Sequence, residues 1–174
     1  MSNLKDAIFK LGYKRFGTAA EILVKKLFNA EVSPDNTYDL IIDEKKVECK
    51  FSRAQKKDTV KVTEDTILEA IFQDANRDID YDTCEFYSWD CNFQQIKKDL
   101  FDVLYYGIFF SDCLVIYSIK SEDINEEVNY SNKQHRGNVG EGQFHINARS
   151  IGLHEKNLVQ ILSYEEIEEC LKLH

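Results

Sequence analysis

The sequence is poor in proline and has no long apolar run, and each absence excludes a class of protein. Only one proline occurs among 174 residues, and no repeat, low-complexity tract or linker interrupts the chain, so we expect a single domain over residues 1–174. No apolar stretch approaches the roughly 20 residues of a membrane-spanning helix. The first residues have no apolar signal core. These features predict a cytoplasmic protein without a membrane partner.

The cysteines are not expected to form disulfide bonds with one another, because their number is odd and no CxxC pair occurs. They lie at positions 49, 84, 91, 113 and 170. This pattern indicates reduced thiols and argues against a disulfide framework or a zinc ribbon. The sequence also has neither a glycine-rich phosphate loop nor a nucleophile elbow.

The chain as a whole is acidic, but one segment of it is basic. The net charge is −9, yet the window from Lys45 to Lys61 contains seven basic and two acidic residues, which makes it +5 and the remainder −14. A local basic patch can bind phosphates while an acidic remainder discourages binding elsewhere. The alternative is a run of charges that only faces solvent.

Apolar periodicity and turn residues divide the chain into alternating helices and strands. We expect helices at 4–14, from Thr18 to 28, at 68–79, 93–108 and 164–173, and strands at 38–42, 45–51, 86–89, 113–119 and 143–147. Gly17 is expected to separate the first two helices. Elements mixed in this way predict an α/β fold with a central sheet flanked by helices.

The segment from residue 38 to 51 predicts a β-hairpin with a two-residue turn at Asp43–Glu44. Such a turn places Asp39 opposite Glu48, with Cβ atoms roughly 5 Å apart on one side of the hairpin. Lys50 shares that side, because it lies two residues beyond Glu48. A three-residue turn would instead bring Cys49 beside Asp39. The apolar residues all fall on the opposite side with the two-residue turn, which favours it.

Two facing carboxylates with a neighbouring ammonium have the chemistry of phosphodiester hydrolysis. Carboxylate oxygens can share a Mg²⁺ ion at about 2.1 Å. The ion can polarise a phosphate oxygen and lower the pKa of a bound water, while the ammonium offsets charge in the transition state. The alternative is an exposed hairpin whose acids and lysine form weak ion pairs.

Asp39 followed by Glu48-Cys49-Lys50 resembles the bipartite D…(D/E)-x-K signature of the PD-(D/E)XK nucleases, the restriction-endonuclease-like superfamily. The resemblance covers residues 17–62 and implies a central mixed sheet, a Mg²⁺ cofactor for which Mn²⁺ substitutes, and double-stranded DNA as the partner. It implies metal ligation by Asp39, Glu48 and the backbone carbonyl of Cys49, with Lys50 assisting the water. The literal Pro-Asp pair is Pro34–Asp35, but it lies in a turn, so Asp39 is preferred.

In many members of that family a preceding helix supplies another glutamate, and Glu21 matches this position. Two structural roles compete with metal binding. Thr18 and Glu21 have the spacing of a capping box, and Glu21 can also pair with Lys25 on the same helix face.

Two further groups of residues are predicted to contact DNA. Arg53, Lys56 and Lys57 follow the hairpin and offer positive charge to phosphates. The polar segment beyond residue 131 offers side chains that read base edges, and Gln143 and His145 face one way on a short strand. Its members are Lys133, Gln134, His135, Arg136 and Asn138. The alternative for this segment is a surface loop without function.

Together these features predict a small type II restriction endonuclease that works as a homodimer, since a two-fold protein matches a palindromic duplex. The aromatic stretch 105–110 is either a dimer contact or part of the core. A structure-selective nuclease such as a Holliday junction resolvase is the alternative within nucleases. A non-catalytic DNA-binding module on the same fold is the alternative outside them.

Overall fold

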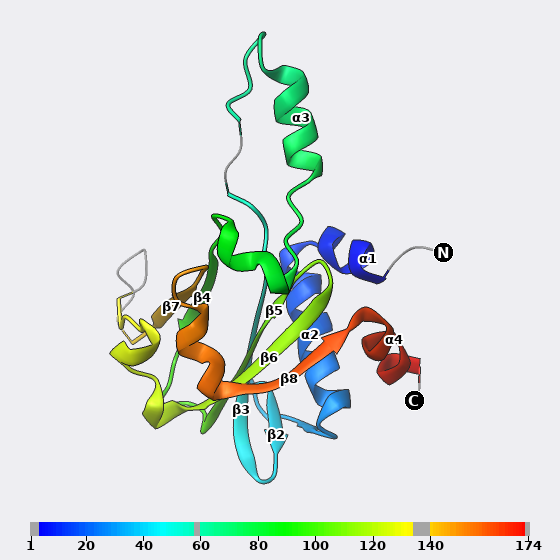
Figure 1. Ribbon diagram of the computed structural model, residues 1–174. Helices are drawn as coiled ribbons and strands as arrows, with labels where there is room; N and C mark the ends of the chain where they lie inside the picture. Colours follow the sequence, from blue (N-terminus) through cyan, green and yellow to red (C-terminus); the bar gives the residue numbers. More distant parts are fainter. Residues whose placement is uncertain (1–3, 58–59, 134–139, 173–174) are drawn as a thin grey trace.

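The centre of the molecule is a mixed six-stranded sheet, seen in a computed structural model that describes residues 4–57, 60–133 and 140–172 (Figure 1). Its strands, in spatial order, are β1 (Glu31–Val32), β2 (Leu40–Ile42), β3 (Lys45–Arg53), β5 (Val103–Phe109), β6 (Cys113–Lys120) and β8 (Leu158–Ser163). β3 and β5 run parallel, and the other neighbouring strands are antiparallel. The predicted α/β class with a central mixed sheet is confirmed.

Helices cover one face of this sheet, and a smaller sheet covers the other. The helices are α1 (Leu4–Lys10), α2 (Tyr13–Leu27) and α4 (Tyr164–Lys172). Their apolar faces pack on β5, β6 and β8 in a cluster that includes Phe16, Leu23, Leu114 and Ile167. The opposite face packs on β4 (Cys91–Ile96) and β7 (Gly142–Ile146), which pair with each other. The 3₁₀ segments are η1 (Tyr81–Phe86), η2 (Ser121–Asp123), η3 (Glu126–Val128) and η4 (Ile151–Asn157).

One helix lies outside the layers formed by the two sheets and the other helices. α3 (Ile67–Ala75) stands on an arm that projects from the sheet, at the top of Figure 1. Leu68, Ile71 and Phe72 on this helix are exposed, and only Ala70 among its described side chains is buried. Apolar side chains of this size are seldom left in water together without an interaction to make.

The hairpin, two later strands and the C-terminal helix follow the sequence expectations. Ile42 pairs with Lys45, which gives the two-residue turn. The strand predicted at 113–119 is β6, the one at 143–147 is β7, and the closing helix is α4. In the part of the chain that the structure describes, no helix is long and apolar enough to cross a membrane.

The helix predicted over residues 93–108 is wrong. This segment forms β4 and β5, joined by a turn. Apolar residues at 93, 96, 100, 104 and 108 fit helical spacing, but β5 is the centre of the sheet and is buried on both faces, so it has no polar face from which to tell the period. Gly107 packs so closely on Phe51 that a Cβ there would meet its ring. The stretch 105–110 therefore belongs largely to the core, as one of its two expected roles has it.

The predicted boundary between the first two helices is also wrong. α2 begins at Tyr13 with Gly12 as its N-cap residue, and Gly17 lies inside the helix. The Thr18 hydroxyl donates to the Lys14 carbonyl at 3.2 Å, as hydroxyls inside helices do, so Thr18 caps nothing. Residues 86–89 likewise form no strand, because Phe86 is the last residue of η1 and residues 87–89 are irregular.

Candidate functional site

The hairpin of β2 and β3 brings the predicted catalytic residues together. Leu40 pairs with Val47, so Asp39, just before β2, stands opposite Glu48. Its carboxylate accepts the Cys49 backbone N–H at 2.8 Å, which fixes the side chain across the hairpin. Lys50 Nζ lies 2.5 Å from Glu48 Oε1. The Asp39, Glu48 and Lys50 side chains thus share one side of the hairpin, as the two-residue turn predicts.

Glu21 approaches the same side from α2. Neither structural role considered for it holds: Thr18 is no cap, and Glu21 and Lys25 form no ion pair among the described residues. Burial, and then the negative charge of Asp39, raise the pKa of the Glu21 carboxyl. Because charges interact measurably only when they lie close together, Glu21 belongs to the electrostatic environment of the hairpin carboxylates.

Glu48 is held in a partly buried position with an opposing cation. Burial raises the pKa of its carboxyl, although the ion pair with Lys50 acts in the other direction. Burial also raises the pKa of the neighbouring Cys49 thiol well above its usual value, with Asp39 adding to the effect. Cys49 therefore stays a neutral thiol packed in the core, and only its backbone carbonyl is a possible ligand.

Asp39, Glu48 and Lys50 border a pocket of about 390 Å³. Its other walls come from residues 36–38, from Leu100 and Phe101, and from three polar residues that the sequence did not reveal: Gln95, Lys97 and Glu141. Lys97 and Glu141 form an ion pair at 3.2 Å. Gln95 lies at an irregularity of β4 with a φ of 59°. Gln95 and Lys97 were missed because residues 93–108 were expected to form a helix, and no sequence signal marks the bulge.

The donor chemistry of this site suits Mg²⁺ or Mn²⁺. Asp39, Glu48 and Glu21 offer the hard oxygen ligands that Mg²⁺ prefers. Burial raises the pKa of both glutamates, and a cation bound nearby would act in the other direction and favour their charged forms. Among the described residues, however, no three His, Cys, Asp or Glu side chains converge closely enough to enclose an ion. Mg²⁺ commonly retains several waters, so two carboxylates are a sufficient protein share.

The basic residues after the hairpin do not form one phosphate-binding patch. Arg53 donates to the carbonyls of Ile8, Phe9 and Leu11 and so completes the C-terminal end of α1. One guanidinium nitrogen of Arg53, Nη1, is thus engaged within the protein, and the phosphate contact expected of Arg53 stays a prediction. Lys56 lies over the Tyr87 ring, with Nζ 4.3 Å from its centroid.

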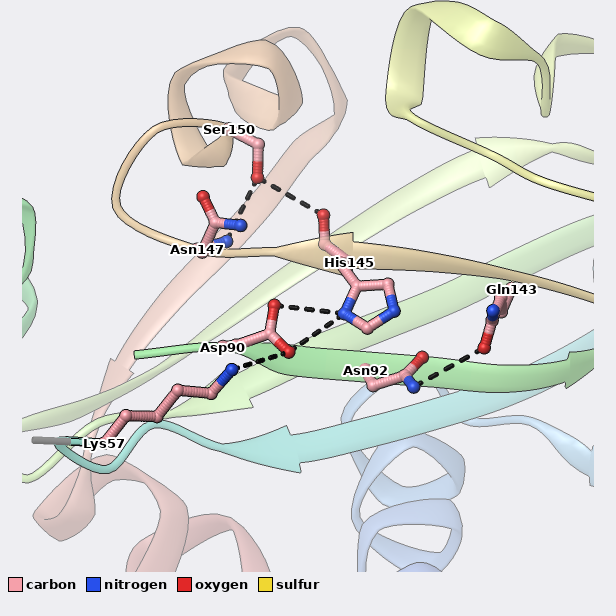
Figure 2. Close-up of polar contacts among 7 residues, drawn as sticks. All are labelled: Lys57, Asp90, Asn92, Gln143, His145, Asn147 and Ser150. Carbon is pink, nitrogen blue, oxygen red and sulfur yellow. Dashed lines mark hydrogen bonds and ion pairs between the residues drawn. The ribbon is translucent and has the colours of Figure 1, made fainter. Parts of the chain in front are cut away.

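The predicted base-reading residues fall partly within the described chain. Gln143 and His145 do face one way on β7, outward from the buried Phe144. Gln143 donates to the Lys133 carbonyl at 3.3 Å, and His145 Nδ1 lies 2.9 Å from Asp90, which Lys57 also contacts (Figure 2). The sequence did not predict this pairing of His145 with Asp90. Gln134, His135, Arg136 and Asn138 lie outside the described residues.

Comparison with known proteins identifies no relative: no family model, no curated protein and no solved structure matches the chain.

Proposed function

We propose that this protein is a Mg²⁺-dependent endonuclease of the type II restriction class that hydrolyses phosphodiester bonds at a specific site in double-stranded DNA. Mn²⁺ is expected to replace Mg²⁺. The observation that supports the proposal is the arrangement of Asp39, Glu48 and Lys50 on one side of a hairpin, bordering a pocket, with Glu21 in electrostatic contact. An exposed hairpin with ordinary ion pairs would not need a partly buried acid facing another acid.

The residues divide the work of hydrolysis among them. Asp39 and Glu48 each use one oxygen in a protein contact, so the second oxygen of each is available to hold the metal, with the Cys49 carbonyl beside them. When bound, the ion supplies charge that polarises a phosphate oxygen and makes water a better nucleophile. Lys50 then exchanges its contact with Glu48 for the attacking water, orients it, and offsets the negative charge that builds on phosphorus.

A second candidate is a structure-selective nuclease such as a Holliday junction resolvase. Phe86 and Tyr87, at the other end of β4 from the hairpin, are exposed. Exposed rings are surfaces on which unpaired bases can stack, and branched DNA offers such bases more readily than a plain duplex.

The deciding experiment incubates the protein with plasmid and phage DNA and with a four-way junction, each with Mg²⁺ and with Mn²⁺. Discrete bands from linear duplex support the restriction enzyme, and cleavage of the junction alone supports the resolvase. DNA binding without cleavage under any of these conditions would favour the non-catalytic module and overturn the proposal.

Variants assign the activity to the hairpin. Asp39→Asn, Glu48→Gln and Lys50→Ala should each abolish cleavage and leave DNA binding largely intact, because metal ligation and water activation are separate from phosphate contacts. Asp35→Asn is the matched control: its carboxylate only bonds Thr37 in an exposed turn, so cleavage should continue at the wild-type rate. A hairpin variant that still cuts normally would show that the site lies elsewhere.

A further inference from the structure

A second pocket lies at the end of β4 that is remote from the hairpin. Its volume is about 420 Å³, and it is lined by Lys57, by residues 85–90 and by residues 147–149. Two of its side chains are aromatic rings in contact with solvent: Phe86 is 76% exposed and Tyr87 is 39% exposed. A pocket of this size accepts a small ligand or one unit of a polymer, and exposed rings at its wall favour a ligand with a flat face.

One wall of the pocket is fixed by a polar network (Figure 2). The Asp90 carboxylate contacts His145 Nδ1 at 2.9 Å and Lys57 Nζ at 3.2 Å. The Ser150 hydroxyl donates to the His145 carbonyl at 3.2 Å and accepts the Asn147 N–H at 3.0 Å, which ties the end of β7 to the following turn. The network balances the charge of Asp90 and holds Lys57 at the pocket.

The remaining charges suit an anionic ligand that also has hydrogen-bond donors. Arg149 lines the pocket from the turn after β7, and its backbone N–H donates to Asn147 Oδ1 at 3.0 Å. Lys56 lies over the outer wall at Tyr87. With Asp90 already paired, Glu85 is the other acid among the described residues that line the pocket, and a carboxylate there can accept hydrogen bonds from the amino group of a base.

We propose that this pocket binds one unpaired nucleotide of a nucleic acid, with the base stacked on Phe86 and Tyr87 and the phosphate near Lys57 and Arg149. The inference deepens the proposed nuclease function and rests on it for the kind of ligand. In a duplex both faces of each base are covered by its neighbours, so an aromatic wall is useful only to a base that is extruded or single-stranded.

The position of the pocket relates it to the cleavage site. β4 connects the two, since Asp90 precedes the strand while Gln95 and Lys97 line the hairpin pocket. At about 3.3 Å per residue, the separation is roughly 20 Å. That length corresponds to about six base-pair steps of 3.4 Å. The unpaired nucleotide is therefore expected about six positions from the bond that is cut.

The test measures binding of a short single strand carrying the fluorescent base 2-aminopurine, in EDTA, so that no cleavage or divalent metal is involved. Phe86→Ala should raise Kd about tenfold, the usual effect of removing one stacked ring. It should also remove the fluorescence change that stacking produces. Arg149→Ala should raise Kd and reduce the salt slope by about 0.7, the loss of one phosphate contact on single-stranded DNA.

Matched controls carry the same substitutions away from the pocket. Tyr13→Ala removes an exposed ring from α2, and Arg15→Ala removes an exposed cation from the same helix; neither should change Kd. The proposal is overturned if the strand does not bind, or if Phe86→Ala and Tyr13→Ala have equal effects. The binding assay needs no metal, so the two proposals can fail separately. If the protein cuts no DNA but Phe86→Ala weakens binding, the nucleotide-binding proposal stands and the nuclease proposal fails. If the protein cuts DNA normally but Phe86→Ala has no effect, only the nucleotide-binding proposal fails.

Discussion

At the scale of single residues, Glu21 shows how a helix boundary decides a functional assignment. In sequence, Thr18 and Glu21 have the spacing of a helix cap, and this role competes with a place in the site. The helix in fact begins at Tyr13, so Glu21 does not lie in its first turn and cannot take part in a cap. Glu21 interacts instead with the charges of Asp39, Glu48 and Lys50, which all affect the pKa of its carboxyl.

We therefore predict that Glu21→Gln weakens the response to metal while the fold is retained. Loss of an outer carboxylate typically lowers metal affinity by about 10- to 100-fold, so cleavage should require correspondingly more Mg²⁺ and recover at saturating concentrations. The measurement is cleavage rate against Mg²⁺ concentration. Thr18→Ala serves as the control and should match the wild type. An unchanged Mg²⁺ curve for Glu21→Gln would place this side chain outside the site.

A second residue-scale prediction concerns His154, which is completely buried against Tyr106. Burial lowers the pKa of His154 from 6.5 to about 4. The unfolded chain then binds a proton more readily than the folded one below about pH 6.5, so stability present at neutral pH is lost on acidification. The histidine's share of this loss should be about 2 kcal/mol between pH 7 and pH 5.

Denaturant unfolding of wild type and His154→Gln at several pH values measures this share. The variant starts from a lower stability but should lose less of it on acidification. The raised pKa values of Glu21 and Glu48 act in the opposite direction, because the folded chain binds their protons more tightly; comparison with the variant cancels their contribution. Parallel pH curves for both proteins would mean that His154 does not titrate in this way.

At the scale of elements, the turn between β2 and β3 controls the site through its length. Asp43 and Glu44 have φ values of 49° and 63°, which is the left-handed conformation of a type I′ turn. Asp is common at the first of these positions, but Glu is not favoured at the second, where Gly adopts a positive φ at lower cost. The alternation of the strands predicted the turn length, whereas the residues of the turn itself did not predict its type.

Replacing Asp43–Glu44 by Asn-Gly should therefore stabilise the protein by about 0.5–1 kcal/mol and leave cleavage unchanged, because the register is kept. Denaturant midpoints and cleavage rates measure both effects. An insertion of one glycine in the turn provides the contrast: it shifts the parity of one strand, separates Asp39 from Glu48 and should abolish cleavage. Activity that survives the insertion would contradict the geometry proposed for the site.

Arg53 connects two elements, and its substitution should affect stability. It donates to three carbonyls at the end of α1, and its guanidinium carbon lies 4.4 Å from the centroid of the Phe16 ring. Arg53→Met should cost about 2 kcal/mol, a usual value for hydrogen bonds from a charged group. Lys57→Met, which removes an exposed ion pair, should cost under about 1 kcal/mol. Equal losses in thermal unfolding would contradict this structural role.

Sequence reasoning succeeded where a local pattern has one solution and failed where burial hides the pattern. The hairpin alternates apolar and polar residues, so only one register buries Leu40, Val47 and Cys49 together. β5 offers no such alternation, and its apolar spacing was equally compatible with a helix. The pairing of Asp90 with His145 joins residues 55 positions apart, and no local pattern predicts a contact of that kind.

At the scale of the whole molecule, basic residues from the window 45–61 contact different parts of the protein. Lys50 faces the acids of the hairpin, Arg53 turns to α1, and Lys56 and Lys57 reach the second pocket. A window that is +5 in sequence is thus no continuous basic surface. Fewer of these cations are then available to neutralise phosphates than the sequence window suggests, which predicts a modest dependence of DNA affinity on salt.

The last prediction is that two copies associate through the arm that carries α3. A two-fold dimer matches the symmetry of a palindromic duplex, and β5, the stretch first considered for the contact, is buried in the sheet. Leu68, Ile71 and Phe72 are instead presented to solvent on a projecting helix, with Phe72 65% exposed. Burying such side chains against their copies in a second chain would release the water that covers them.

Light scattering should accordingly give the mass of a dimer for the wild type and of a monomer for Leu68→Lys with Phe72→Lys. These side chains make no core contact, so circular dichroism of the double variant should be unchanged. Leu158→Lys with Val159→Lys, which alters an exposed apolar pair on the edge strand β8, is the matched control and should remain dimeric. A wild type that stays monomeric with and without DNA would contradict the dimer itself, whereas dissociation by the β8 pair alone would move the interface from the arm to the sheet edge.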